Sequence, residues 1–170
     1  MTNPKRPRAR WLSQSEKQLF NACLSGLARL ARRRRDGLAF PLLRGLARLT
    51  LAYRRSKPVG SDPRALAEEW QRLMPSRKMV PITAVEGDTA FGEIRVECPL
   101  RGTGDVEACF RLMEYDRSLM RAHGAQFVVL RSQAEAGVSV CEIAIRPQLL
   151  PAADLIPAHR RVGQAASPEA

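Results

Sequence analysis

The spacing of the apolar residues changes near Pro75, and this change restricts the fold more than any other feature of the chain. Before Pro75 the apolar residues recur three or four positions apart, as they do on one face of a helix: Leu19, Phe20, Cys23, Leu24, Leu27, Leu30 and Ala31. After it they alternate with charged residues, as in a strand with one buried face: Ile94, Val96 and Cys98 against Glu93, Arg95 and Glu97. Helices followed by hairpins predict an α+β fold.

Local signals place the expected elements. We expect helices over residues 13–35, 39–55 and 63–74, a hairpin over 82–98, a helix over 105–123 and a second hairpin over 126–146. Ser13 with Glu16 forms a capping-box pattern, Asp36 and Gly37 are typical of a helix end, and Gly124 is a second terminator. The sequence therefore predicts an N-terminal helical hairpin, one more helix, and a ββαββ antiparallel sheet.

The charge is distributed unevenly along the chain. Residues 1–60 contain 15 Lys and Arg but only Glu16 and Asp36, a net charge of +13, whereas residues 61–170 carry 13 basic and 15 acidic residues, a net charge of −2. We expect three regions: a basic helical region over 1–60, an α+β domain over 61–150, and a tail over 151–170 that wraps the domain as far as Ile156 and then frays. The basic region predicts an anionic partner, either nucleic acid or an anionic membrane surface.

The sequence also indicates the redox compartment of the protein and whether it spans a membrane. The first residues show no secretory signal pattern, so the four cysteines are expected to be reduced thiols in a cytoplasmic protein. The most apolar window, residues 38–53, is interrupted by Arg44 and Arg48 and is shorter than the roughly 18 to 20 residues of a membrane span. No transmembrane segment is expected.

Three cysteines, Cys98, Cys109 and Cys141, are predicted to point into the core of the α+β domain. Free cysteines often serve as small buried apolar residues. Thiolates are also soft ligands that suit zinc or an iron–sulfur cluster, so the three form a candidate metal site. His123 does not complete that site if one helix runs from Cys109 to His123, because 14 residues then separate the two by about 21 Å. Cys23 completes it only if the first helix packs over the sheet.

A catalytic role for the thiols is the third interpretation. Asp116 lies seven residues after Cys109 and hence on nearly the same side of the expected helix. A thiol and a carboxylate that line one pocket can act as nucleophile and general base, which makes Cys109, Asp116 and Cys141 the candidate catalytic residues. The alternative is that Glu114 and Asp116 form ion pairs with arginines of the same helix.

Several short motifs resemble a known family. They are Cys98-Pro99-Leu100 at a strand end, Cys109 early in the next helix, and residues 130–134 leading through Gly137 to Cys141-Glu142-Ile143. Over residues 79–147 the chain resembles the L-2-aminothiazoline-4-carboxylate hydrolases and, more distantly, the sensor domains of the methanogen output and 4-vinyl reductase type. The resemblance implies a small α+β unit that holds a ligand or a metal centre against its sheet.

Three functions are therefore expected as alternatives. The first is a ligand- or metal-binding, sensor-like domain with a cysteine-lined site. The second is a hydrolase that opens a C–N or C–S bond of a small heterocycle. The third is binding of nucleic acid or an anionic membrane through the basic N-terminal hairpin.

Overall fold

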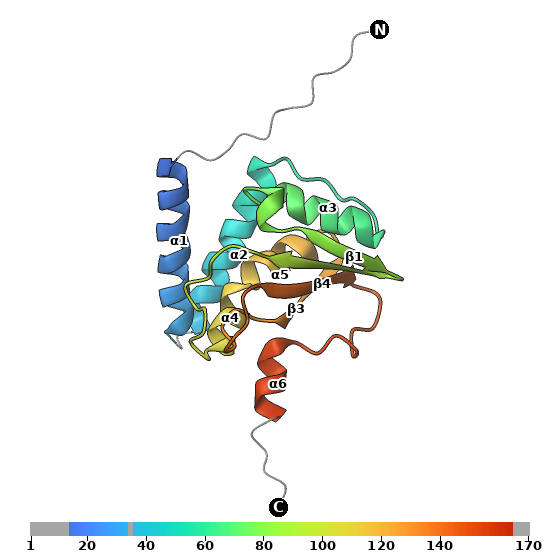
Figure 1. Cartoon of the computed structure of the whole chain (residues 1–170). Helices are drawn as coiled ribbons and strands as arrows, with labels where there is room; N and C mark the ends of the chain where they lie inside the picture. The colour runs from blue at the N-terminus through green and yellow to red at the C-terminus, as the bar shows by residue number, and fades with distance from the viewer. Residues whose placement is uncertain (1–13, 34–35, 165–170) are drawn as a thin grey trace, which may run out of the picture.

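The computed structural model describes residues 14–33 and 36–164. Within them the fold is α+β, with a four-stranded antiparallel sheet in the order β1-β2-β4-β3 (Figure 1). The helices are α1 (Gln14–Arg32), α2 (Asp36–Tyr53), α3 (Pro63–Leu73), the 3-10 turn η1 (Arg77–Met79), α4 (Val106–Leu112), α5 (Glu114–Arg121) and α6 (Ala158–Gln164). The strands are β1 (Ile82–Glu86), β2 (Thr89–Ile94), β3 (Ala125–Arg131) and β4 (Cys141–Pro147).

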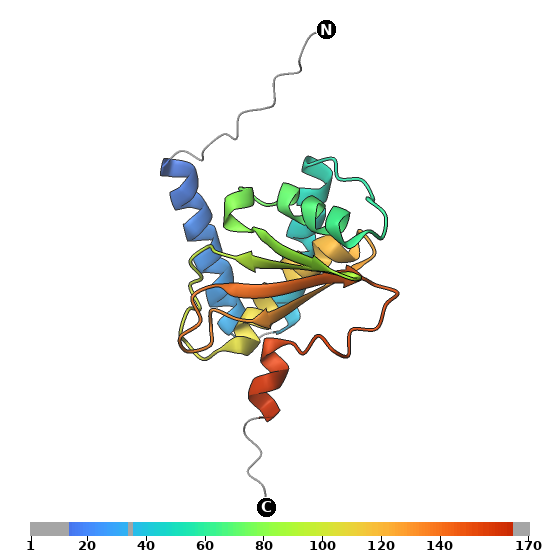
Figure 2. The same ribbon diagram turned by 45° about the vertical axis from the view of Figure 1, so that its right-hand side comes forward.

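Helices α1, α2, α3 and α5 form two layers on one face of the sheet. Helices α3 and α5 pack directly on the strands, whereas α1 and α2 lie farther out, against α4 and α5 (Figure 2). This arrangement buries the inward rows of the sheet, in which Phe127 and Ile145 are cross-strand neighbours, as are Val129 and Ile143. Ala28 and Ala31 of α1 belong to the same buried cluster. The first helix therefore shares a core with the sheet.

Close packing of α3 on the sheet depends on Gly92 of β2. The ring of Trp70 lies beside that of Phe127, with 5.4 Å between the centroids. A Cβ atom on Gly92 would come within 3.0 Å of the Pro81 carbonyl oxygen and 3.5 Å of the Trp70 ring. The absence of a side chain there lets Trp70 lie close to the strand.

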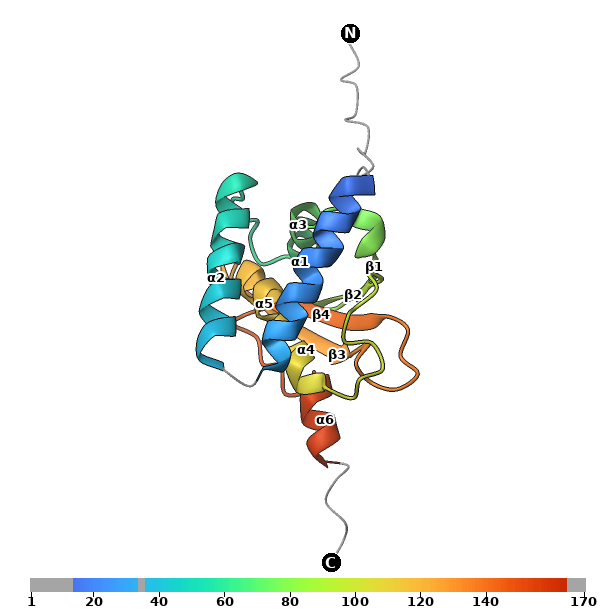
Figure 3. The ribbon, with the colours of Figure 1, turned by 90° about the vertical axis from the view of Figure 1, so that its left-hand side faces the viewer.

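Helices α1 and α2 run in opposite directions and diverge toward the start of α1 (Figure 3). A charged side chain links α1 to α4, and another links α2 to α5. The Nε atom of Arg111 in α4 donates to the carbonyl oxygen of Ala31, in the last turn of α1, at 2.6 Å. The Nε atom of Arg44 in α2 donates to Glu114 of α5, also at 2.6 Å. The predicted helical hairpin is thus anchored to the domain at two points.

Local signals predicted several helix ends correctly. Asp62 caps α3 by accepting from the Ala65 amide at 2.8 Å, and Pro63 is its first residue. Asp105 caps α4 in the same way. Gly124 ends α5 with a φ of +68°, a conformation that favours glycine. Ser13, the expected cap of the first helix, lies outside the described residues.

The expected helix ending at Asp36 and Gly37 was wrong in detail, because these two residues form the first turn of α2. The expected single helix over 105–123 was also wrong. It is divided at Met113, whose ψ of 4° departs from helical geometry. Both halves contact α2, but α4 also packs on α1 and α6, whereas α5 also packs on α3 and β3. The break allows each half to follow its own neighbours.

The strand boundaries also differ from the expectation. Strand β2 ends at Ile94 rather than at Cys98, because the Gln133 side chain binds the backbone that follows it. Its Nε2 atom donates to the Ile94 and Val96 carbonyl oxygens, and its Oε1 atom accepts from the Cys98 amide. Strand β4 begins at Cys141 rather than at Val138.

The tail beyond Ile156 does not fray at once, because residues 158–164 form α6. The His159 ring lies 4.0 Å from that of Phe110, measured between centroids, and this contact holds α6 against α4. Among the described residues, none of the helices combines the length and apolar character needed to cross a membrane.

Candidate ligand-binding pocket

A pocket of about 420 Å³ lies between the outer helices and one end of the sheet. Apolar side chains supply most of its wall: Leu24 and Leu27 of α1, Leu43 and Leu46 of α2, Leu73, Met74, Met79, Val80, Ile94, Val96, Leu112 and Met113. The divergence of α1 from α2 creates the space, because each helix contributes one side of it. Pockets that bind small molecules commonly have this size and apolar character.

All four cysteines line this pocket. Cys109 comes from α4 and Cys141 from the first position of β4, and both are buried. Cys98 comes from the segment after β2 and is partly buried, and Cys23 comes from α1 and is exposed. The predicted inward direction of Cys141, shared with Ile143 and Ile145, is confirmed, and the three cysteines of the α+β region do converge on one site.

Cys109 and Cys141 act on each other. The Cys109 thiol donates a hydrogen bond to Cys141, and this bond together with burial raises the pKa of Cys109, whereas accepting it lowers the pKa of Cys141. The backbone amide of Gln133 donates to Cys141 Sγ at 3.3 Å and favours its thiolate further. Burial raises the pKa of Cys98. Cys141 is therefore the member of the pair that loses a proton first.

Asp116 of α5 also lines the pocket, beyond the thiols. Its Oδ1 atom accepts from Trp70 Nε1 at 2.9 Å. Burial raises the pKa of this carboxyl to about 6, although the Trp70 hydrogen bond opposes the change. The structure thus brings the candidate catalytic residues Cys109, Asp116 and Cys141 to one pocket.

The alternative ion-pair interpretation holds for Glu114 but not for Asp116. The Glu114 carboxylate accepts from Arg44 and Arg117 and lies 3.6 Å from Arg121. Asp116 instead has Trp70 as its partner, from a helix 46 residues earlier in the chain. The two acids of α5 therefore have different roles, because Glu114 attaches α2 and Asp116 lies at the pocket.

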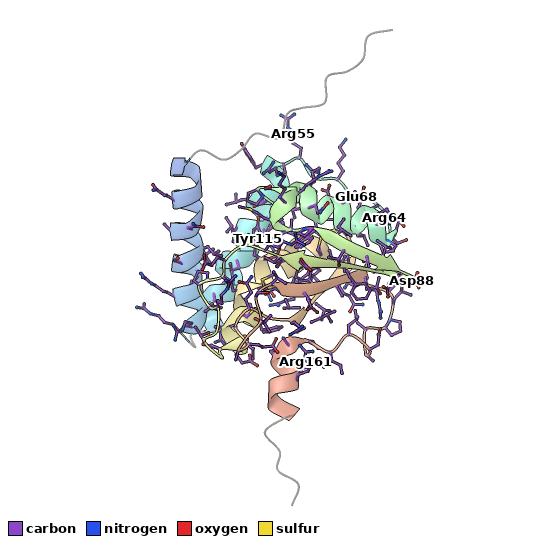
Figure 4. All side chains as sticks on the ribbon, viewed as in Figure 1. Arg55, Arg64, Glu68, Asp88, Tyr115 and Arg161 are labelled. Carbon is purple, nitrogen blue, oxygen red and sulfur yellow. The ribbon has the colours of Figure 1, made fainter. Side chains whose placement is uncertain are left out.

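Two further polar contacts shape the wall. The hydroxyl groups of Tyr115 and Thr50 lie 3.0 Å apart and join α5 to α2 (Figure 4 labels Tyr115). The fully buried Gln133 positions the Cys98 segment through the hydrogen bonds described above. Because its Oε1 atom also accepts from Arg101, the Gln133 amide is engaged by the protein itself.

The predicted metal site has no geometric support within residues 14–33 and 36–164. No three His, Cys, Asp or Glu side chains there are placed so that they could together hold a metal ion. His123 belongs to another cluster, where its Nε2 atom lies 3.1 Å from Ser56 Oγ and 3.8 Å from Glu69. Zinc and an iron–sulfur cluster remain predictions from the cysteines alone.

Sequence reasoning missed most of the pocket wall. The residues of α1 and α2 that line it were assigned to a separate basic region. One signal in the sequence could have identified them: residues 38–53 are apolar on more faces than one buried stripe requires. The partner of Asp116, in contrast, has no local signal, because Trp70 lies on a different helix.

Comparisons of the chain with models of known protein families, with curated proteins and with solved structures found no match. The proposals below therefore depend on the geometry of the pocket and on the chemistry of its residues.

Proposed function

We propose that this domain binds a small, mainly apolar molecule in the pocket between α1, α2 and the sheet. The observation that carries the proposal is the wall itself, which lines about 420 Å³ with leucine, methionine, valine and isoleucine side chains. The pocket is open to solvent, so these apolar side chains are in contact with water. An apolar ligand would remove them from water and add contacts to them.

The polar groups of the pocket indicate how such a ligand is oriented. The groups that can meet a polar end of the molecule include Asp116, Tyr115, Thr50, Arg54 and the cysteine thiols. A carboxylate accepts hydrogen bonds, so Asp116 favours a ligand that carries a hydroxyl or amino group. The proposal includes a cytoplasmic setting, where the free thiols stay reduced.

Binding of the neutral fluorescent probe N-phenyl-1-naphthylamine tests the proposal. The wild-type protein is expected to bind the probe with increased fluorescence. Leu27→Trp and Met79→Trp place a larger side chain in the pocket, so each is expected to weaken binding by at least about tenfold.

Leu149→Trp is the matched control, because Leu149 is 99% exposed and is not one of the pocket residues. It should bind the probe as the wild type does. Far-UV circular dichroism establishes that each variant is folded. Absence of wild-type binding, or equal binding by both pocket variants in the folded state, would overturn the proposal.

Hydrolysis is the second candidate function, and one observation favours it: Cys141, with its lowered pKa, shares the pocket with Asp116. A thiolate is the nucleophilic form of cysteine. Incubation with 2-aminothiazoline-4-carboxylate, followed by mass spectrometry, tests this candidate. Ring-opened product that Cys141→Ser abolishes would support it, and the absence of product in the wild type would reject that substrate.

A further inference from the structure

The outer side of α2 carries a stripe of exposed apolar side chains, which we call the outer face of α2. Its members are Leu38, Leu42 and Leu49, with exposed fractions of 62%, 51% and 68%. Four and seven residues separate them in turn, so they share one side of the helix. Leu46 and Tyr53 lie beside this side and line the pocket, while Ala39, Leu43 and Ala47 are buried on another side of the helix. Helix α2 is thus apolar both toward the protein and away from it.

The helices that carry this face are rich in exposed arginines. Arg48 is exposed on α2, and Arg29, Arg32 and Arg33 are exposed near the end of α1. Across residues 1–60 of the sequence the net charge is +13. An exposed apolar stripe is therefore combined with a strongly basic part of the chain.

We propose that the outer face of α2 docks on an anionic lipid bilayer. Leucine side chains that point out of the protein can enter the boundary between headgroups and acyl chains, while the arginines of α1 and α2 attract anionic headgroups. The 18 residues of α2 give it a length of roughly 27 Å, which lies along the surface rather than across it. Docking through this face needs no membrane-spanning helix.

Charge decides between a bilayer and the other possible partners. Two copies of the chain that met through this face would bring two regions of +13 together, which repel each other. Nucleic acid would satisfy the arginines, but its phosphates offer the leucines no apolar contact. An anionic bilayer matches both the charge and the apolar side chains.

Vesicle co-sedimentation tests the proposal with the full chain. Vesicles of phosphatidylcholine alone are compared with vesicles that also contain phosphatidylserine. The wild type is expected to sediment with the second kind and to be released by salt. Leu42→Glu and Leu49→Glu are expected to weaken this binding by at least about tenfold, because each places a carboxylate in the docking face.

The controls separate this face from the rest of the surface and from the pocket. Leu149→Glu makes the same change at a residue that is 99% exposed and far along the chain, and it should bind as the wild type does. Arg48→Glu should weaken binding more than Arg64→Glu, since Arg64 lies on the outer side of α3 (Figure 4). Leu42 and Leu49 are not among the residues that line the pocket, so their variants should still bind N-phenyl-1-naphthylamine.

Three outcomes would overturn the proposal. The first is a wild type that ignores phosphatidylserine vesicles. The second is undiminished vesicle binding by folded Leu42→Glu and Leu49→Glu. That result is expected if the arginines alone bind phosphates, whether these belong to lipid or to RNA. The third is a dimer in analytical ultracentrifugation that Leu49→Glu dissociates without changing vesicle binding, which would assign the face to a second copy.

Discussion

Asp116 is a buried carboxyl group that has the neutral Trp70 as its hydrogen-bond partner and the charge of Arg117 nearby. Trp70 donates one hydrogen bond to it, and burial disfavours its charged form. Because the carboxyl also lines the pocket, its protonation state sets the charge that a ligand meets there. At neutral pH the group is mainly ionised, and below pH 6 it is mainly neutral.

Asp116→Asn is expected to change how stability depends on pH. The folded-state pKa of about 6 lies above the ordinary value of 3.8, so the folded wild type binds the proton more tightly than the unfolded chain does. The stability that this proton contributes is present below pH 4 and is lost as the pH rises through 6. The shift corresponds to at most about 3 kcal/mol.

Urea unfolding of both proteins at pH 4 and pH 7 checks this prediction. The amide oxygen that Asp116→Asn introduces can still accept from Trp70, and the amide does not titrate. The free energy of unfolding of the variant, relative to that of the wild type, should therefore be higher at pH 7 than at pH 4. If this relative free energy of unfolding is the same at pH 4 and pH 7, Asp116 is not held in a desolvated position.

The sequence contained enough information to predict the direction of Cys141 but not the partner of Asp116. Cys141 alternates with Ile143 and Ile145 on one strand, and that pattern is local. The Trp70–Asp116 hydrogen bond joins α3 to α5, so it depends on how the two helices pack. The same applies to Gln133, whose side chain contacts the segment that leaves β2.

Among the helices, α2 depends most clearly on a charged contact for its position. Glu114 of α5 is buried, with a side chain that is 4% exposed, and it accepts from Arg44 of α2. Burial opposes ionisation, but the hydrogen bonds from Arg44 and Arg117 hold the pKa of Glu114 below its usual value. Stability from this contact is therefore present above about pH 4.5 and is lost as the pH falls.

Glu114→Ala is expected to destabilise the protein by roughly 3 kcal/mol, because Arg117 would be left partly buried without its carboxylate. Glu93→Ala is the matched control, since Glu93 pairs with Arg95 at 2.7 Å on the surface and should contribute less than about 1 kcal/mol. Urea unfolding at pH 7 measures both. Equal losses would contradict the anchoring role of Glu114.

Helix ends were predictable where a single residue decides them, and unpredictable where packing does. Asp62 and Pro63 fix the start of α3 by local chemistry. The break at Met113 arises because α4 and α5 have different neighbours, and the residues before and after it remain good helix formers. Sequence periodicity alone therefore predicted one helix where the chain forms two.

For the molecule as a whole, α1 shares one hydrophobic core with the α+β sheet, while Ala47 of α2 belongs to a second buried cluster with Leu73 and Leu119. Ala28 and Ala31 of α1 belong to the same buried cluster as Ile143 and Phe127 of the sheet. The two helices and the sheet all contribute to the pocket, with Leu27 and Leu43 on one side and Ile94 and Cys141 on the other. The pocket therefore requires all of them to be in place.

A single cooperative unfolding transition is expected as a result. In a Trp11→Phe background, fluorescence reports on Trp70 in the core, and far-UV circular dichroism reports on all helices together. The two signals should change over the same range of urea concentration. Earlier loss of helical signal, with Trp70 still buried, would show that α1 and α2 unfold separately from the sheet.

Helix α6 has a consequence for how copies of the chain behave toward one another. In the strand order β1-β2-β4-β3, β3 is an outer strand, and the backbone groups on its outer edge are a template on which another strand can pair. Arg161 of α6 donates to the Leu130 carbonyl oxygen of β3, while the helix packs against that strand. A proteolytic cut ahead of Ala158 would remove this cover and leave the edge open to strand-by-strand polymerisation.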